Sequence, residues 1–196
     1  MGKVVFDMTV SLDGYIAGPD ENAEQPLGAN GERLHDWISR SAESTEDGAV
    51  LTELFTSSGA VVAGRRTFDM SDGPNGWGDG PLGRDVPVYV VTHEAPVRDR
   101  SGGAVFTFVT EGIESALKQA KDAAGDKDVY VMGGADLARQ YVEAGALDEI
   151  QLHVVPVLLG AGRRLFDSID TGPVELDVVR VVSTPHATHI RYRLPR

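Results

Sequence analysis

Five short apolar runs rich in β-branched residues alternate with segments of helical spacing, and this alternation restricts the fold more than any other feature of the chain. The runs are Val4–Val10, Ala60–Ala63, Val86–Thr92, Ala104–Val109 and Val129–Met132. The helical segments are Leu34–Ser41, Ala49–Phe55, Ile113–Ala123 and Leu137–Ala144. Because helical crossovers join parallel strands, the pattern predicts an α/β protein with a largely parallel sheet.

The last third of the chain follows a different pattern, which predicts antiparallel strands. The predicted strands are Glu149–Val157, Val174–Val182 and Ala187–Leu194, with a turn at Pro185 and His186. Polar and apolar residues alternate from Thr188 to Leu194, as expected for a sheet with one solvated face. The predicted sheet is therefore mixed and mostly parallel, with flanking helices and a C-terminal antiparallel hairpin. No repeat or linker divides the 196 residues, so residues 1–196 are predicted to form one domain.

The charge and the cysteine content exclude several classes of function. The net charge of −12, from 18 Lys and Arg against 30 Asp and Glu, repels nucleic-acid backbones and acidic membrane surfaces. The chain has no cysteine, which excludes disulfides, thiolate nucleophiles and cysteine-ligated zinc. The N-terminus lacks the pattern of a targeting signal, and no run approaches the roughly 18 apolar residues of a membrane span. We therefore expect a cytoplasmic protein that binds neither nucleic acid nor membranes.

Gly64, Arg65, Arg66 and Thr67 form the first pattern typical of ligand binding, since they follow an apolar run and begin a predicted helix. Free backbone N–H groups and the dipole at a helix start favour an anion, and arginine adds a fork of donors that matches phosphate. The same residues are equally compatible with a plain turn that carries two solvated arginines. The pattern alone leaves both interpretations open.

A second turn of this kind lies at Gly133 and Gly134, between an apolar run and a predicted helix. Two glycines permit backbone conformations closed to other residues and allow a ligand to approach closely. The pair does not match the G-x-G-x-x-G fingerprint, and by itself it is more typical of a tight turn than of a phosphate site. Because ligands of open α/β sheets collect at the carboxyl ends of the strands, the two turns together favour a phosphate-bearing ligand.

Asp13 follows the first predicted strand within the segment Ser11–Ala17 and reaches the same edge of the sheet. A carboxylate there can orient a substrate or relay a proton, although Asp13 and Gly14 are also typical of a simple turn. Two predicted loops, residues 17–33 and 71–86, are long enough to be functional or mobile.

The remaining motifs point to no other chemistry. The five histidines show no paired metal spacing, so no metal is predicted, and His186 and His189 are expected to be solvated on the hairpin. Gly160–Gly162, followed by Arg163 and Arg164, is interpreted as a bend between packed segments. The motifs of serine hydrolases and of P-loop nucleotidases are absent.

Five ordered blocks of the chain carry a family resemblance. They are Ser11–Ala17, Gly64–Phe68, Val88–Thr92, Met132–Gly134, and Leu147–Glu149 leading to Pro156–Phe166. These blocks resemble the reductase domain of riboflavin-biosynthesis deaminase/reductases and the related stand-alone dihydrofolate reductase-like proteins. The resemblance spans nearly the whole chain. It implies a dihydrofolate reductase-like fold, NADPH as the hydride donor, and a cis peptide bond between Gly133 and Gly134.

The resemblance also implies which residues bind the cofactor. Those near the phosphates would be Gly64, Arg65, Arg66 and Thr67, and those near the adenosine would be Thr92 and His93. The pyrophosphate and the nicotinamide ribose would lie along Gly133, Gly134, Ala135, Asp136 and Leu137. The nicotinamide would be bordered by Val10, Ile16 and Ala17.

Three departures from the family narrow the expected function. The absence of cysteine removes the zinc-dependent deaminase half of the bifunctional enzymes, so only the reductase function remains. The Leu-Pro-Trp segment of dihydrofolate reductases is missing, which weakens folate as the substrate. A basic residue often stands at the position of His93, so the preference for NADPH over NADH depends on Arg65 and Arg66.

We therefore hypothesise an NADPH-dependent reductase that acts on a small heterocycle of the pterin, folate or ribosylaminopyrimidine type. Asp13 is the first catalytic candidate. Asp47 is the second, because dihydrofolate reductases carry an acidic residue for the substrate in that region. The candidate substrate contacts are Ser11, Phe68 and Trp77, of which the two aromatic residues are equally compatible with the core. The competing hypothesis is a dinucleotide-binding protein without turnover. The C-terminal strands predict a homodimer, as in the related reductases.

Overall fold

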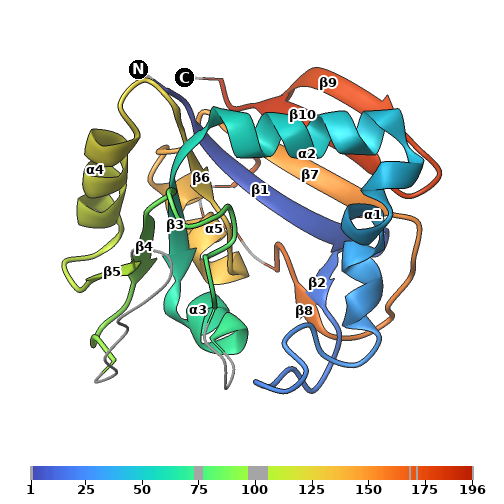
Figure 1. The fold of residues 1–196 in the computed structure, drawn as a ribbon, viewed down its shortest axis with the longest axis horizontal. Helices are drawn as coiled ribbons and strands as arrows, with labels where there is room; N and C mark the ends of the chain where they lie inside the picture. The colour runs from blue at the N-terminus through green and yellow to red at the C-terminus, as the bar shows by residue number, and fades with distance from the viewer. Residues whose placement is uncertain (1, 73–76, 97–105, 168, 171, 196) are drawn as a thin grey trace.

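The computed structural model describes residues 2–72, 77–96, 106–167, 169–170 and 172–195. Its centre is an eight-stranded sheet in the order β5-β4-β3-β6-β1-β7-β10-β9 (Figure 1). The strands are β1 (Val4–Ser11), β3 (Ser58–Gly64), β4 (Val88–Val91), β5 (Phe106–Val109), β6 (Asp128–Val131), β7 (Glu149–Val155), β9 (Asp177–Ser183) and β10 (Thr188–Arg193). All neighbours from β5 to β7 pair in parallel, while β10 pairs antiparallel with β7 and β9. The predicted mixed sheet with a C-terminal hairpin is confirmed.

Helices cover both faces of this sheet. They are α1 (Asp36–Ser39), α2 (Thr45–Ser57), α3 (Arg65–Ser71), α4 (Ile113–Ala124) and α5 (Ala135–Glu143), with 3-10 turns η1 (Gly31–His35) and η2 (Ser41–Glu43). Val62 of β3 faces α4 and α5, where it packs with Leu117 and Tyr141, whereas its neighbour Val61 faces α3 and packs with Phe68. Figure 1 shows α1 and α2 in front of β1 and β7. Burial on both faces explains why the central strands are nearly continuous apolar runs.

Several predicted boundaries differ from the observed ones. The predicted helix Leu34–Ser41 is divided into η1, α1 and η2. The predicted helix Ala49–Phe55 is the centre of the longer α2, which begins after Ser44 because the Ser44 hydroxyl accepts a hydrogen bond from the Asp47 N–H at 3.2 Å. The predicted strand Glu149–Val157 ends at Val155, since Pro156 has no N–H for the ladder. Residues 104–105 of the strand predicted over 104–109 lie outside the described residues.

A short antiparallel ribbon of β2 (Tyr15–Ala17) and β8 (Arg163–Arg164) was not predicted. The bend expected at Gly160–Gly162 leads directly into it. A side chain at Gly162 would overlap the Ala17 carbonyl oxygen, so only glycine allows this approach. The ribbon places two arginines beside the start of the first long loop, and this position shapes the site described next. Within the described ranges, no helix combines the length and apolar character that crossing a membrane requires.

Candidate active site

The two glycine turns meet at the carboxyl edge of the sheet, because β3 and β6 are parallel neighbours that end side by side. The N–H of Gly64 donates a hydrogen bond to the carbonyl of Gly133 at 2.8 Å. The peptide bond between Gly133 and Gly134 is cis, as predicted. Gly133 has a φ of 93°, and an added Cβ would lie 2.9 Å from the Met8 methyl group and 3.3 Å from the Thr67 hydroxyl. Position 133 therefore requires glycine.

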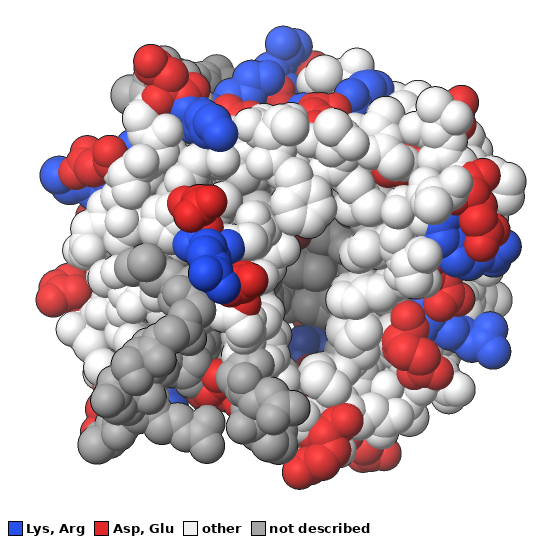
Figure 2. All heavy atoms as spheres, in the orientation of Figure 1, with Lys and Arg blue, Asp and Glu red and all other residues white. Residues whose placement is uncertain are grey.

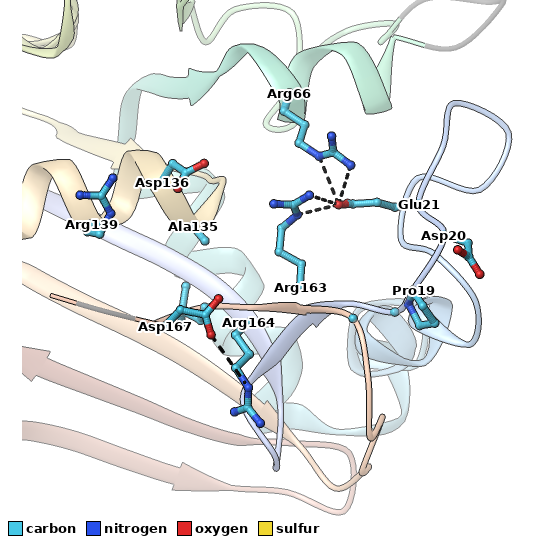
Figure 3. Close-up of a pocket in the computed structure, with 13 residues that line it drawn as sticks. Pro19, Asp20, Glu21, Arg66, Ala135, Asp136, Arg139, Arg163, Arg164 and Asp167 are labelled. Carbon is cyan, nitrogen blue, oxygen red and sulfur yellow. Dashed lines mark hydrogen bonds and ion pairs between the residues drawn. The ribbon is translucent and has the colours of Figure 1, made fainter.

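A cleft of about 560 Å³ opens beside these turns. It is lined by Gly18, Pro19, Asp20, Glu21, Arg66, Ala135, Asp136, Arg139, Gly162, Arg163, Arg164, Leu165 and Asp167 (Figure 3). We call this space the arginine cleft. Its walls are the starts of α3 and α5, the loop after β2 and the segment around β8. In the space-filling view the face below α2 is hollowed near its centre, with basic atoms visible inside the hollow (Figure 2).

Glu21 holds two of the arginines across the cleft. Its Oε1 accepts hydrogen bonds from Arg66 Nη2 at 2.7 Å and Nε at 3.1 Å, and from Arg163 Nε at 2.6 Å. Arg163 Nη2 lies 2.5 Å from the same oxygen. Arg66, a predicted cofactor residue, thus lies in the cleft. Glu21 was not predicted to contribute, and Arg163 was expected only to follow a bend. A signal for Arg163 existed, since Gly162-Arg163-Arg164 repeats the Gly-Arg-Arg pattern of Gly64-Arg65-Arg66.

Arg65 points to the other side of α3, toward the end of β4. It pairs with Asp69 at 2.8 Å and donates to the Thr92 hydroxyl at 3.2 Å and to the Glu94 carbonyl at 2.6 Å. Thr92 is buried and His93 is exposed at the same strand end. Val10, Ile16 and Leu137 belong to the core cluster under the edge, and Ala17 is buried beside it. The structure therefore gathers the predicted cofactor residues along one edge of the sheet.

Asp13 connects the end of β1 to the segment at Leu159 and Gly160 through hydrogen bonds. Its carboxylate accepts hydrogen bonds from the Ser11 hydroxyl at 2.6 Å, the Gly160 N–H at 2.7 Å and the Leu159 N–H at 3.1 Å. The hydrogen bond from Ser11, helped by those two backbone N–H groups and opposed by partial burial, lowers the pKa of Asp13 to about 2. Asp13 is therefore ionised at neutral pH. Ser11 is buried, and its hydroxyl also accepts from the Tyr15 N–H at 2.9 Å.

Asp47 lies beneath the surface, inside a group of histidines. Its two oxygens contact His189 Nε2 at 2.7 Å and His186 Nδ1 at 2.8 Å, and His189 Nδ1 lies 2.6 Å from His153 Nδ1. His153 also contacts Asp7 at 3.3 Å. We call these five residues the histidine cluster. The expectation of solvated His186 and His189 is wrong, because α2 covers this part of the hairpin and Asp47 supplies an acceptor for both rings.

Burial and hydrogen bonding set the ionisation of this cluster. Burial acts to raise the pKa of Asp47, but the hydrogen bonds from His189 and His186 outweigh it and leave the pKa below its usual value. Burial lowers the pKa of His189 despite the opposing effect of Asp47. Asp47 has no exposed surface, so in this conformation it offers no oxygen to a ligand.

Phe68 and Trp77 form part of an aromatic cluster under α3. Phe68 is 1% exposed and lies 5.0 Å from the ring of Phe108, and Trp77 is stacked 5.7 Å from Phe106. Neither residue lines the arginine cleft. The core interpretation therefore fits their positions better than a substrate contact does. Among the residues described, no group of three or more acidic or histidine side chains is arranged to hold a metal ion.

Residues 2–190 match the model of the RibD C-terminal domain. The chain belongs to this family. It is also similar to solved structures that share the fold. A protein of Shewanella sp. PV-4 named for riboflavin biosynthesis is 21% identical, with a TM-score of 0.72 and 99% of each chain covered.

Two further structures carry more specific names. A diaminohydroxyphosphoribosylaminopyrimidine deaminase/5-amino-6-(5-phosphoribosylamino)uracil reductase of Thermotoga maritima is 16% identical, with a TM-score of 0.64, and aligns with 99% of this chain and 57% of its own. Dihydrofolate reductase of Enterococcus faecalis, complexed with NADP(H), is 15% identical with a TM-score of 0.62, covering 100% of this chain and 98% of its own. The fold is therefore dihydrofolate reductase-like, as the resemblance implied.

Proposed function

We propose that this protein is an NADPH-dependent reductase that transfers hydride to a small heterocycle of the ribosylaminopyrimidine or pterin type. The observation that carries the proposal is the contact between Gly64 and Gly133, where two glycine turns meet beside a cleft with arginines in its wall. Such a strand-end site suits the phosphates of a dinucleotide. Membership of the RibD C-terminal family and the fold shared with a dihydrofolate reductase bound to NADP(H) support the same cofactor.

The residues at this edge fit the cofactor. Gly133 and Gly134 present bare backbone, and the first N–H groups of α5, which begins at Ala135, have no partner inside their own helix. We propose that the phosphates lie along Gly64–Thr67 and Gly133–Leu137, with the adenosine near Thr92 and His93 and the nicotinamide over Val10, Ile16 and Ala17. When bound, the nicotinamide supplies the hydride, while the protein supplies position and charge.

We propose that Asp13 acts by position rather than as a proton donor. Its carboxylate is ionised at neutral pH and holds the segment at Leu159 and Gly160, which leads into β8 and the wall of the cleft. Asp47 is enclosed by its histidines, so its proposed role is to support the sheet under the hairpin. The heterocycle would then occupy the arginine cleft, which has the volume for it.

Ligand binding followed by turnover tests this function. We expect NADPH to raise the melting temperature more than NADH or a flavin does, and the absorbance of the reduced nicotinamide to fall with a ribosylaminopyrimidinone or a pterin present. A Gly133→Ala variant should lose the NADPH-induced shift. The absence of any stabilisation by NADPH would overturn the proposal.

A second function, dinucleotide binding without turnover, is favoured by one observation. Both acidic candidates, Asp13 and Asp47, already have their oxygens bonded within the protein, so no free carboxylic acid has been assigned to protonate a substrate. Tight NADPH binding with no turnover across the substrate panel would select this function over the reductase.

We also propose that residues 1–196 act as one domain, since one eight-stranded sheet contains strands from both ends of the described chain.

We further propose that two copies associate through β9, the outer strand of this sheet. This outer strand exposes Val178 by 63%, Val179 by 48% and Val181 by 56%. An edge strand with exposed valines is suited to pairing with a second copy. Light scattering should give the mass of a dimer for the wild type and of a monomer for Val179→Lys.

A further inference from the structure

The contact between Glu21, Arg66 and Arg163 joins three separate parts of the chain across the cleft. Arg66 stands at the start of α3, Arg163 lies in β8, and Glu21 reaches from the loop after β2 (Figure 3). All four arginine nitrogens in the contact end on one oxygen, Oε1 of Glu21, which has room for about two good hydrogen bonds. The donors in this contact therefore exceed what that one oxygen can accept.

The two guanidinium groups need an anion between them. Each carries a permanent positive charge, and their shared contact to one oxygen brings them close enough to repel each other. The side chains of Glu21 and Arg163 are 13% and 35% exposed, whereas that of Arg66 is 52% exposed, so solvent screens the contact only in part. The other two cleft arginines are engaged elsewhere. Arg139 pairs with Glu143 along α5, and Arg164 lies over the ring of Tyr15 at 4.6 Å.

We propose that Arg66 and Arg163 form a phosphate subsite of the cleft, which Glu21 occupies in the absence of ligand and leaves when a phosphate group binds. A phosphate offers several oxygens to two forked donors, whereas the Glu21 contact uses one. The phosphate would come either from the cofactor or from a phosphorylated substrate. This inference deepens the proposed function and rests on it only for the identity of the phosphate-bearing ligand.

Glu21 can leave without dismantling its loop. The hydrogen bonds that close the loop join its flanks, from the Gly18 N–H to the Leu27 carbonyl and from the Ala29 N–H to the Pro19 carbonyl. The turn beyond Glu21 is closed by Asn22, whose side chain accepts from the N–H of Gln25 at 3.0 Å. Rotation of the Glu21 side chain therefore opens the subsite while the backbone stays in place.

The test measures ligand binding by calorimetry with inorganic pyrophosphate, ribose 5-phosphate, NADPH and NADH. Glu21→Gln removes the competing charge, so we expect the phosphate probe that uses the subsite to bind about tenfold more tightly, the usual scale for one charge-assisted contact. Arg163→Met should weaken the same probe by about tenfold. Glu24→Gln is the matched control, because it removes an exposed carboxylate from the same loop at a position that does not line the cleft. It should change affinity less than twofold.

The four probes separate the sources of the phosphate and the two proposals. A gain in Glu21→Gln for NADPH but not for ribose 5-phosphate assigns the subsite to the cofactor, and a gain for ribose 5-phosphate assigns it to a substrate. If no dinucleotide binds any variant while pyrophosphate still responds to Glu21→Gln, the subsite stands and the proposed function fails. Equal affinities in wild type, Glu21→Gln and Arg163→Met for every probe would overturn the subsite, even where NADPH binds and turns over.

Discussion

The arginine cleft and the histidine cluster are both rich in charged groups, but they satisfy those groups in opposite ways. In the cleft, Arg66 and Arg163 depend on one carboxylate from a surface loop. In the cluster, every ring nitrogen and carboxylate of Asp47, His189 and His153 meets a partner inside the protein. A charged group whose partner can be exchanged therefore indicates ligand binding, whereas a charged group whose partners belong to the core indicates a role in stability.

Removal of Asp47, the acceptor at the centre of the histidine cluster, should have the largest effect on stability. Asp47→Ala leaves the N–H groups of His186 and His189 buried without an acceptor, so the free energy of unfolding should fall by about 2–5 kcal/mol. Denaturant unfolding measures this loss. Asp20→Asn removes the same charge from the surface and should change stability by about 0.5 kcal/mol or less. Because none of the cluster lines the cleft, a loss of NADPH affinity with intact folding would contradict the separation of the two regions.

A side chain at Gly133 should instead weaken cofactor binding beside the arginine cleft. In Gly133→Ala the new methyl group meets Met8 and Thr67 at a positive φ, which should cost about 1–3 kcal/mol and remove most NADPH affinity. Gly145→Ala is a matched control, since Gly145 also has a positive φ, of 60°, but open space around its Cβ. It should share the backbone cost alone. Equal NADPH titrations for the two variants would argue against a cofactor at Gly133.

The pH dependence of stability should depend on the histidine cluster. Because burial lowers the pKa of His189, the unfolded chain binds more protons once the pH falls below about 6.5. The contribution of neutral His189 to the free energy of unfolding is therefore fully present above that pH. It is lost on acidification, by at most about 1.4 kcal/mol per pH unit for one proton. His189→Gln should flatten the fall below about pH 6.5. His35, whose pKa is also lowered by desolvation, acts in the same direction in both proteins.

The smallest effect is expected at Asp13, which shares features of both regions. Asp13 lies near the cleft, yet its carboxylate is bonded like a structural group and its pKa of about 2 keeps it ionised. Asp13→Asn should lower turnover by a few-fold, roughly what loosening a positioning segment costs, and should leave the shape of the pH–rate profile unchanged. A profile that loses one limb in the variant would assign Asp13 a direct role in proton transfer.

Local signals were enough to predict much of this molecule. The strands of the parallel sheet are apolar runs ended by glycine or proline, and both glycine turns follow such runs, so their convergence follows from parallel pairing alone. The cis bond at Gly133 came from the family resemblance and is confirmed. The split of Leu34–Ser41 into three short turns was not readable, because helical spacing also occurs where a chain merely packs one side against a core.

The sequence by itself determined that the sheet is mostly parallel, that both glycine turns lie at its carboxyl edge and which family the chain resembles, because these depend on residues close together in the chain. Only the tertiary structure decided which charged residues face a cleft and which are enclosed. Glu21 meets Arg163 from 142 positions away, and Asp47 meets His189 across the same interval. Contacts of this range leave no periodicity in the sequence, since they depend on how helices and loops settle over the sheet rather than on any local preference.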